Sequence, residues 1–246
     1  MWFFHSITLK ISMIEDNIWE KDPEKYIIGS DEVGRGSFAG PICASAVKIN
    51  YNQLYLLDSV KDSKKLSPKK REEIFEIVLE NNIEYSFEEA SNTYIDNFGI
   101  KNANEKVLND SISSLYTGAE IVYVDHFKIK NFNAVSIVRG EDNCRAIALA
   151  SIIAKVLRDK LMVDFSKDFP EYFLEKNKGY GTKEHRQAIF DYGMSKIKPR
   201  PHKTSPDKAP SLHFFWFFHD FLKNFIARSL IFLSLGKVFK PECSTP

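Results

Sequence analysis

The sequence has few cysteines, no excess of either charge and no long uninterrupted apolar run. Three cysteines occur in 246 residues, at Cys43, Cys144 and Cys243, and they are too few and too far apart for a disulfide framework or a zinc site. Lys and Arg number 34, Asp and Glu number 33, and the net charge is +1. This balance excludes a uniformly basic nucleic-acid binder, although one face of the molecule can still be basic.

Neither end of the chain has the features of a membrane segment. Residues 1–14 lack a basic start, a continuous apolar run and a small-residue cleavage site, so we expect no signal peptide, and Met13 is a second possible start. Charged residues interrupt the Phe-rich stretch 212–235, and a charge at the centre of a bilayer is costly. We therefore expect a cytoplasmic protein with no membrane partner.

Segments that favour strands alternate with segments that favour helices. Hydrophobic residues make up 43% and charged residues 27% of the chain, as in soluble globular proteins. Short apolar runs predict strands at 26–31, 42–49, 83–91, 121–125 and 134–138. Helical spacing predicts one helix that starts at Ser67-Pro68 and others over 102–115, 146–163 and 183–192. The interleaving indicates an α/β fold with a mixed central sheet flanked by helices.

The first predicted helix has a clear start and a clear buried face. Ser67 should be its N-cap, because a hydroxyl there can accept a hydrogen bond from a free backbone N–H, and Pro68 suits the first helical position. The apolar residues that should face the core are Ile74, Phe75, Val78 and Leu79.

Carboxylates follow two of the predicted strands and precede one predicted helix. Asp31 and Glu32 end the first strand, Asp125 ends the fourth, and Glu141 and Asp142 stand ahead of the longest helix. Singly, each also fits a solvated turn or a helix start, where the dipole favours acids. Together they offer oxygen ligands from three distant segments. That set suits Mg²⁺ or Mn²⁺, and a two-metal phosphodiester site is assembled in this way.

Two further groups of residues are suited to nucleic-acid contacts. Gly34 and Gly36 allow a close backbone approach, and Arg35 between them can meet a phosphate. Tyr180 stands between two glycines and can stack on a sugar or base, or pack inside a turn. A basic cluster suits phosphate contacts and also fits a solvated helix start; it contains Lys61, Lys64, Lys65, Lys69, Lys70 and Arg71.

Five motifs make the pattern specific. They are DEVGRGSFAGP at 31–41, KDSKKLS at 61–67, VDH at 124–126, GED with AIALASIIAKVLRD within 140–159, and NKGYGTKEH at 177–185. With these motifs, in this order and at this spacing, the chain resembles ribonuclease HII over residues 26–193. The resemblance implies a ribonuclease H-like fold.

The resemblance also implies an activity. The protein would be an endoribonuclease that cleaves the RNA strand of RNA–DNA hybrids and single ribonucleotides embedded in DNA. The reaction would be metal-assisted hydrolysis with two Mn²⁺ or Mg²⁺ ions, and the products would carry 5′-phosphate and 3′-hydroxyl ends. The partner would be such a duplex, and the protein would act as a monomer.

By the same resemblance, the catalytic and metal-binding carboxylates fall on Asp31, Glu32, Asp125 and Glu141. The family has Asp at the fourth position, so Glu141 is a departure and Asp142 is the alternative ligand. The other family roles fall on residues that would contact the substrate. These are Gly34, Arg35 and Gly36, which would read the 2′-hydroxyl at the RNA–DNA junction, Tyr180, and Ser63 and Lys64 beside the nucleic-acid backbone.

The chain divides into three predicted parts. An N-terminal extension covers 1–25, the catalytic domain covers 26–195, and a basic Pro-rich linker with an apolar helical tail covers 196–246. The tail departs most from the family, and His202-Lys203-Thr204-Ser205 can be a displaced family segment. Residues 212–235 are expected to form a helix whose aromatic face packs on the catalytic domain. Alternatively, a second copy of the chain or a membrane interface would cover this face.

Two other functions fit the sequence less well. A non-catalytic protein that binds hybrid duplexes would follow if the altered tail removed a substrate contact, but the complete acid set favours an enzyme. Ribonuclease HIII is disfavoured, because little chain precedes Tyr26 for a separate substrate-binding domain and because the Gly34-Arg35-Gly36 turn is intact.

Overall fold

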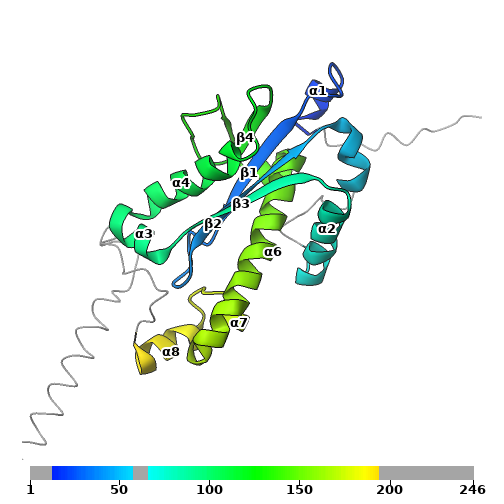
Figure 1. Ribbon diagram of the computed structural model, residues 1–246. Helices are drawn as coiled ribbons and strands as arrows, with labels where there is room; N and C mark the ends of the chain where they lie inside the picture. Colours follow the sequence, from blue (N-terminus) through cyan, green and yellow to red (C-terminus); the bar gives the residue numbers. More distant parts are fainter. Residues whose placement is uncertain (1–12, 58–65, 194–246) are drawn as a thin grey trace, which may run out of the picture. The chain divides into compact units, whose positions relative to one another are not determined.

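A five-stranded mixed sheet forms the centre of the protein (Figure 1). The computed structural model describes residues 13–57 and 66–193. The strand order is β3-β2-β1-β4-β5. The predicted α/β class is confirmed, and all five predicted strands form with ends shifted by at most two residues; they are β1 (Ile27–Val33), β2 (Ile42–Ile49), β3 (Glu84–Ala90), β4 (Ile121–Asp125) and β5 (Val135–Ile137).

Helices cover the sheet on both faces, and the four predicted helices correspond to α2, α4, α6 and α8. The full set of helices is α1 (Asp16–Trp19), α2 (Pro68–Glu80), α3 (Asn92–Phe98), α4 (Ile100–Ser113), α5 (Gly140–Asn143), α6 (Arg145–Asp168), α7 (Leu174–Asn177) and α8 (Lys183–Tyr192). Two 3-10 turns, η1 (Tyr51–Leu57) and η3 (Pro170–Tyr172), complete the described elements.

The central strand β1 is buried on both of its faces. It runs antiparallel to β2 and parallel to β4, and its first five residues are buried. Ile27 packs with α2 and α6 on one face, whereas Ile28 packs with α3 and α4 on the other (Figure 1). This alternation follows from the two-residue period of a strand.

The helix α2 begins as predicted but buries less than predicted. The Ser67 hydroxyl accepts a hydrogen bond from the Lys70 N–H at 3.2 Å, which confirms the N-cap. Ile74, Phe75 and Val78 are buried. Leu79, however, is 49% exposed, so its predicted place in the core is wrong. At 100° per residue, Leu79 lies at the margin of the apolar face, where solvent begins.

Helix α6 crosses the sheet and continues beyond it. It packs on β1 and β2, and it extends five residues past its predicted end at Val163. Its C-terminal half joins a separate apolar cluster with the last helices of the described chain; the members of this cluster are Ala39, Met162, Tyr172, Leu174 and Ala188.

Part of the predicted N-terminal extension packs against the core. Trp19 is 2% exposed and belongs to the apolar cluster under α6. The Ile14 N–H donates to the Asn143 carbonyl at 3.0 Å, and Asp16 pairs with Arg145 at 2.7 Å. Glu15 is fully buried and accepts a hydrogen bond from the Ala146 N–H at 3.1 Å. The segment 13–19 therefore holds the junction between α5 and α6.

An ion pair closes one edge of the sheet. Lys48, at the end of β2, lies 2.9 Å from Glu120, which precedes β4. Burial alone would raise the pKa of Glu120, but hydrogen bonds from Lys48 and Thr117 outweigh it and hold that pKa at about 2. The hydrogen bond to Glu120 in turn raises the pKa of Lys48.

Several predictions concern residues outside the described ranges. The tail helix at 212–235, the linker from 196 onward, and Ser63 and Lys64 all lie there. No helix in the described part of the chain combines the length and apolar character needed to cross a bilayer.

Candidate active site

The acids at the ends of β1 and β4 reach the same edge of the sheet. Because these neighbouring strands are parallel, their carboxyl ends lie together. Ser30 pairs with Val124, so the next residues along each strand, Asp31 and Asp125, are neighbours. The structure thus brings together carboxylates that are far apart in the sequence.

Asp31 faces helix α6 and is 8% exposed. Burial, together with the nearby charges of Glu32, Asp125 and Glu141, raises its pKa from 3.8 to about 8. The Ser151 hydroxyl on α6 donates a hydrogen bond to the Asp31 carboxyl and opposes this shift. An acid in these surroundings favours its protonated form unless a cation is nearby.

Glu32 points to the other face of β1, as expected for the next residue of a strand. It lines an open cleft of about 360 Å³; the other lining residues are Arg35, Asp125, His126, Phe127, Val138 and Arg139. Burial raises the pKa of Glu32, the Arg35 guanidinium 3.8 Å away opposes this, and Asp125 adds to the rise. The cleft is therefore lined by carboxylates and by arginines.

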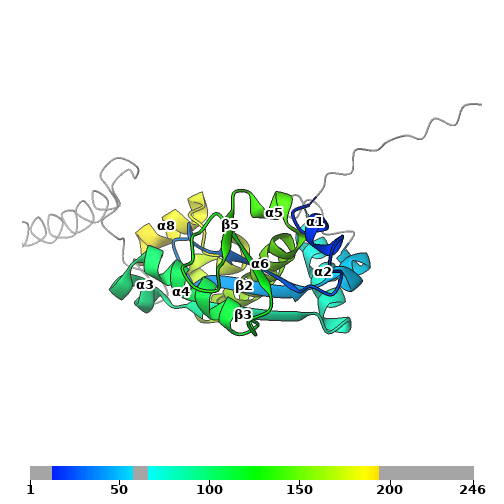
Figure 2. The same cartoon turned by 90° about the horizontal axis from the view of Figure 1, so that it is seen from above.

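The short helix α5 carries the fourth predicted acid. It lies beside β5 and the start of α6 (Figure 2). The Gly140 N–H donates to Asp125 Oδ1 at 2.6 Å, which ties α5 to the end of β4. Glu141 is 8% exposed, whereas Asp142 is exposed to solvent. The burial of Glu141 places it with the acid cluster, and Asp142 faces away from the protein interior.

The carboxylates share one site but do not yet converge on one point. Across residues 13–57 and 66–193, no three His, Cys, Asp or Glu side chains form a group compact enough to hold a metal ion. Asp31 and Glu32 leave β1 on opposite faces because β1 pairs with β2 without a bulge up to Val33. The donor chemistry of the cluster nevertheless matches a hard divalent cation, since its oxygens are carboxylate oxygens.

The two predicted recognition segments lie against each other. The Phe38 and Ala39 N–H groups both donate to the Gly179 carbonyl, at 2.7 and 3.1 Å. Tyr180 is half-buried, and Lys155 Nζ lies 5.3 Å from the centre of its ring. Arg35 and Gly36 are exposed. The segment after β1 and the segment around Tyr180 thus form one continuous surface.

The two glycines beside Arg35 differ in what surrounds them. A Cβ on Gly34, which has φ +94°, would lie 2.4 Å from Arg158 Nε. A Cβ on Gly36 would meet nothing within 4 Å. Gly34 is therefore required by packing inside the protein, and Gly36 is the glycine that leaves open space for a ligand.

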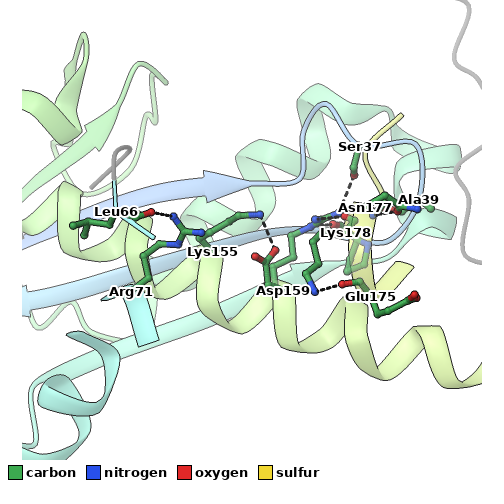
Figure 3. A network of polar contacts seen from close by, with 12 residues as sticks. Ser37, Ala39, Leu66, Arg71, Lys155, Asp159, Glu175, Asn177 and Lys178 are labelled. Atoms are coloured by element: carbon green, nitrogen blue, oxygen red, sulfur yellow. Dashed lines mark hydrogen bonds and ion pairs between the residues drawn. The ribbon is translucent and has the colours of Figure 1, made fainter. Parts of the chain in front are cut away.

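Two described members of the basic cluster make contacts within or next to their own helix. Lys70 pairs with Glu73 at 3.1 Å, and Arg71 donates to the Leu66 carbonyl at 2.6 Å (Figure 3). Ser63 and Lys64 precede this helix in the undescribed segment. The start of α2 thus presents cations, of which Arg71 is half-buried.

Sequence reasoning missed residues on the buried face of α6. Ser151, which contacts Asp31, and Arg158, which is 0% exposed, were not singled out. A signal existed, because Ile147, Ser151, Ala154 and Arg158 recur at spacings of three and four residues and share one helical face. Polar residues within an apolar stripe indicate buried polar contacts.

The family of the chain follows from comparison with known proteins. The family profile described as ribonuclease HII matches residues 28–207. The ribonuclease HII of Rickettsia canadensis is 45% identical over 181 residues, which cover 72% of this chain and 90% of that protein. That of Rickettsia bellii is 45% identical over 191 residues, which cover 77% of this chain and 94% of that protein.

Solved structures share the fold. Ribonuclease H2 from Pyrococcus horikoshii has a TM-score of 0.59 at 23% identity, over 71% of this chain and 92% of that chain. Ribonuclease HII from Archaeoglobus fulgidus, solved with PCNA, has a TM-score of 0.61 at 24% identity, over 75% of this chain and 97% of that chain. Bst-RNase HIII, solved in complex with Mn²⁺, has a TM-score of 0.53 at 17% identity, over 71% of this chain and 72% of that chain. The chain belongs to the ribonuclease HII family and is a ribonuclease H enzyme.

Proposed function

We propose that the protein hydrolyses the RNA strand of RNA–DNA hybrids, and single ribonucleotides embedded in DNA, by a two-metal mechanism. The products would carry 5′-phosphate and 3′-hydroxyl ends. The observation that carries this proposal is the acid cluster at one sheet edge, in which Asp31 lies within the field of Glu32, Asp125 and Glu141.

The cluster is suited to divalent cations of the hard class. Burial first, and repulsion between neighbouring carboxylates second, raise the pKa values of Asp31 and Glu32 in the absence of a cation. Mg²⁺ and Mn²⁺ accept such oxygen ligands, and a ribonuclease HIII of the same fold was solved with Mn²⁺. Asp31, Glu32, Asp125 and Glu141 would hold the ions.

When bound, the cations would make the attacking water more acidic and neutralise charge on the scissile phosphate. The protein's own groups orient the ligands. The Ser151 hydroxyl holds Asp31, and the Gly140 N–H holds Asp125. Arg35 and Arg139 flank the cleft and would contact phosphate oxygens there.

Glu141 is the better candidate for the fourth ligand. Its carboxylate is buried beside the other acids, whereas Asp142 is exposed. The longer side chain of Glu would reach the same metal from a slightly different backbone position than Asp. This assignment is open to a direct test, because the two residues are adjacent and can be changed one at a time.

The recognition surface is suited to a ribonucleotide. The 2′-hydroxyl distinguishes RNA from DNA because it both donates and accepts hydrogen bonds. Backbone groups of the Gly34-Arg35-Gly36 turn would meet it, since Gly36 leaves open space. Tyr180 would stack on the neighbouring sugar or base.

The test is a cleavage assay on three duplexes: one with a single ribonucleotide, one continuous RNA–DNA hybrid and one of DNA alone. We expect cleavage of the first two with Mg²⁺ or Mn²⁺ and none of the third. Asp31→Asn and Glu141→Gln should each lower the rate at least tenfold, about 1.4 kcal/mol in the barrier. Asp142→Asn is the matched control. A wild-type rate in Asp31→Asn would disprove the assignment of the site. A lower rate in Asp142→Asn, with no change in Glu141→Gln, would show that Asp142 is the fourth ligand.

A further inference from the structure

Arg158 is a fully buried charged side chain outside the acid cluster. It lies on α6 and is 0% exposed. A guanidinium carries its charge in proteins, and burying it is costly unless its donors are satisfied. The positions of its acceptors therefore show what it stabilises.

Three of the four hydrogen bonds of Arg158 go to the segment after β1. Nε donates to the Pro41 carbonyl at 3.0 Å, and Nη2 donates to Ser37 Oγ at 2.9 Å and to the Ala39 carbonyl at 3.2 Å. We call Gly34–Pro41 the first loop. It begins with the glycine turn that the proposed function assigns to the ribonucleotide.

The fourth hydrogen bond goes to a different part of the chain. Nη1 donates to the Lys178 carbonyl at 2.9 Å, in the segment 177–181, which we call the second loop (Figure 3). This loop carries Tyr180, and the Arg158 guanidinium carbon lies 5.6 Å from the centre of the Tyr180 ring. One side chain thus contacts both loops and the aromatic ring.

The two loops are also shaped to close on each other. The Gly179 carbonyl accepts hydrogen bonds from the Phe38 and Ala39 N–H groups. Gly179 has φ +82°, and a Cβ there would lie 2.2 Å from the Ala39 carbonyl oxygen. Asn177, which is 6% exposed, accepts a hydrogen bond from the Gly179 N–H and fixes the turn. The second loop therefore cannot shift without disturbing the first.

We propose that Arg158 is a positioning residue that joins the two loops into one recognition unit, so that the glycine turn and Tyr180 meet the ribonucleotide together. Because this role rests on the proposed function, it predicts an effect on substrate binding. The acids are held by other groups, Ser151 and Gly140 among them, so metal binding should not change.

Arg158→Lys is the most direct variant. Lysine keeps the positive charge, but its ammonium group is compact. It cannot donate to both loops at once as the planar guanidinium of arginine does. We expect the KM for a duplex with one ribonucleotide to rise roughly tenfold, with a smaller fall in kcat. The Mn²⁺ concentration for half-maximal activity should stay the same.

Two more variants separate positioning from loss of stability. Ser37→Ala removes one of the four hydrogen bonds of Arg158 and should raise KM by less than Arg158→Lys does. If Arg158→Lys does not fold, the KM of Ser37→Ala tests the proposal. Lys48→Met breaks the ion pair at the other edge of the sheet. It should lower the melting temperature and leave KM unchanged.

Several outcomes would overturn the proposal. If Arg158→Lys has a lower melting temperature but a wild-type KM, Arg158 contributes to stability alone and does not position the loops for the substrate. A shifted Mn²⁺ requirement would place its effect on the acid cluster. If the wild-type protein cleaves none of the duplexes, the proposed function fails, and amide exchange still tests the loop coupling. The Phe38 and Ala39 N–H groups should then exchange faster in Arg158→Lys, and unchanged exchange would refute the coupling.

Discussion

Burial and three neighbouring carboxylates act on Asp31 in the same direction, and both favour its neutral form. The folded pKa of about 8 lies above the ordinary value of 3.8. The folded state therefore binds a proton that the unfolded state has released between these two values. It follows that the free energy of unfolding of the metal-free protein falls as the pH rises through this window.

Replacing Asp31 with asparagine should stabilise the metal-free protein while it lowers the rate of cleavage. Asparagine imitates the neutral carboxyl and never acquires the buried charge. We expect a gain on the order of 2 kcal/mol at pH 8–9 and little at about pH 3 or below, where the Asp31 carboxyl is protonated in the folded and the unfolded state alike. Urea unfolding in EDTA measures this. Asp142→Asn, at an exposed acid, should leave stability unchanged, and a loss of stability in Asp31→Asn would contradict the picture.

The pH dependence of cleavage should shift with the concentration of metal. A cation and a proton compete for the Asp31 carboxylate, so the rate should fall as the pH drops below the raised pKa. Raising the Mg²⁺ concentration should move the pH of half-maximal rate to lower values. Initial rates measured from pH 5 to 9 at several Mg²⁺ concentrations give this shift. A midpoint that does not move with metal would mean that another group controls the profile.

At the scale of elements, the start of α6 depends on a segment that precedes the sheet. Glu15 accepts the hydrogen bond of the Ala146 N–H, and Asp16 pairs with Arg145. An acid at this position satisfies a free backbone donor and complements the positive end of the helix dipole. The same segment contacts α5, so it also holds the turn that carries Glu141.

Glu15→Ala should therefore affect both stability and metal use. Losing the buried acceptor should cost about 1–2 kcal/mol in the free energy of unfolding. The Mg²⁺ requirement for cleavage should rise, because α5 is held less firmly. Urea unfolding and a metal titration of the rate are the measurements. Glu20→Ala, at an exposed acid of the same segment, is the control. An unchanged Mg²⁺ requirement would show that the segment serves stability alone.

The elements themselves could be predicted because their signals are local. Apolar runs located the strands, and the Ser67-Pro68 pair located the start of α2. The acid cluster was also within reach, since parallel neighbours bring Asp31 and Asp125 to one edge. The spacing of Arg158 on α6 indicated a buried polar contact, but its partners were out of reach, because three of its four acceptors are backbone carbonyls of two distant loops and such partners leave no trace in residue types.

At the scale of the whole molecule, the two edges of the sheet differ in their electrostatics. Carboxylates that repel one another lie together at one edge, whereas Lys48 and Glu120 form an ion pair at the other. The lowered pKa of Glu120 means that its ion pair contributes stability above pH 4.5. That contribution is lost as the pH falls toward about 2.

Acid unfolding should therefore depend on this pair. Between pH 5 and 2 the wild-type protein should lose about 2–3 kcal/mol through Glu120. Lys48→Met should be less stable at neutral pH and should lose less on acidification. Thermal unfolding at pH steps of one unit in EDTA gives both curves. Parallel curves for the two proteins would show that the pair does not govern acid stability.

Helix α6 connects Ser151, beside Asp31, with Arg158, between the loops. Seven residues separate them, or about 10 Å along the axis at 1.5 Å per residue. The helix thus fixes both the distance and the rotational phase between Asp31 in the proposed metal site and the two loops of the proposed recognition unit. One alanine inserted after Ile153 would move Arg158 by about 1.5 Å and rotate it by about 100°. Substitutions within this stretch alter single contacts, whereas a change in its length should displace the proposed recognition unit from the proposed metal site.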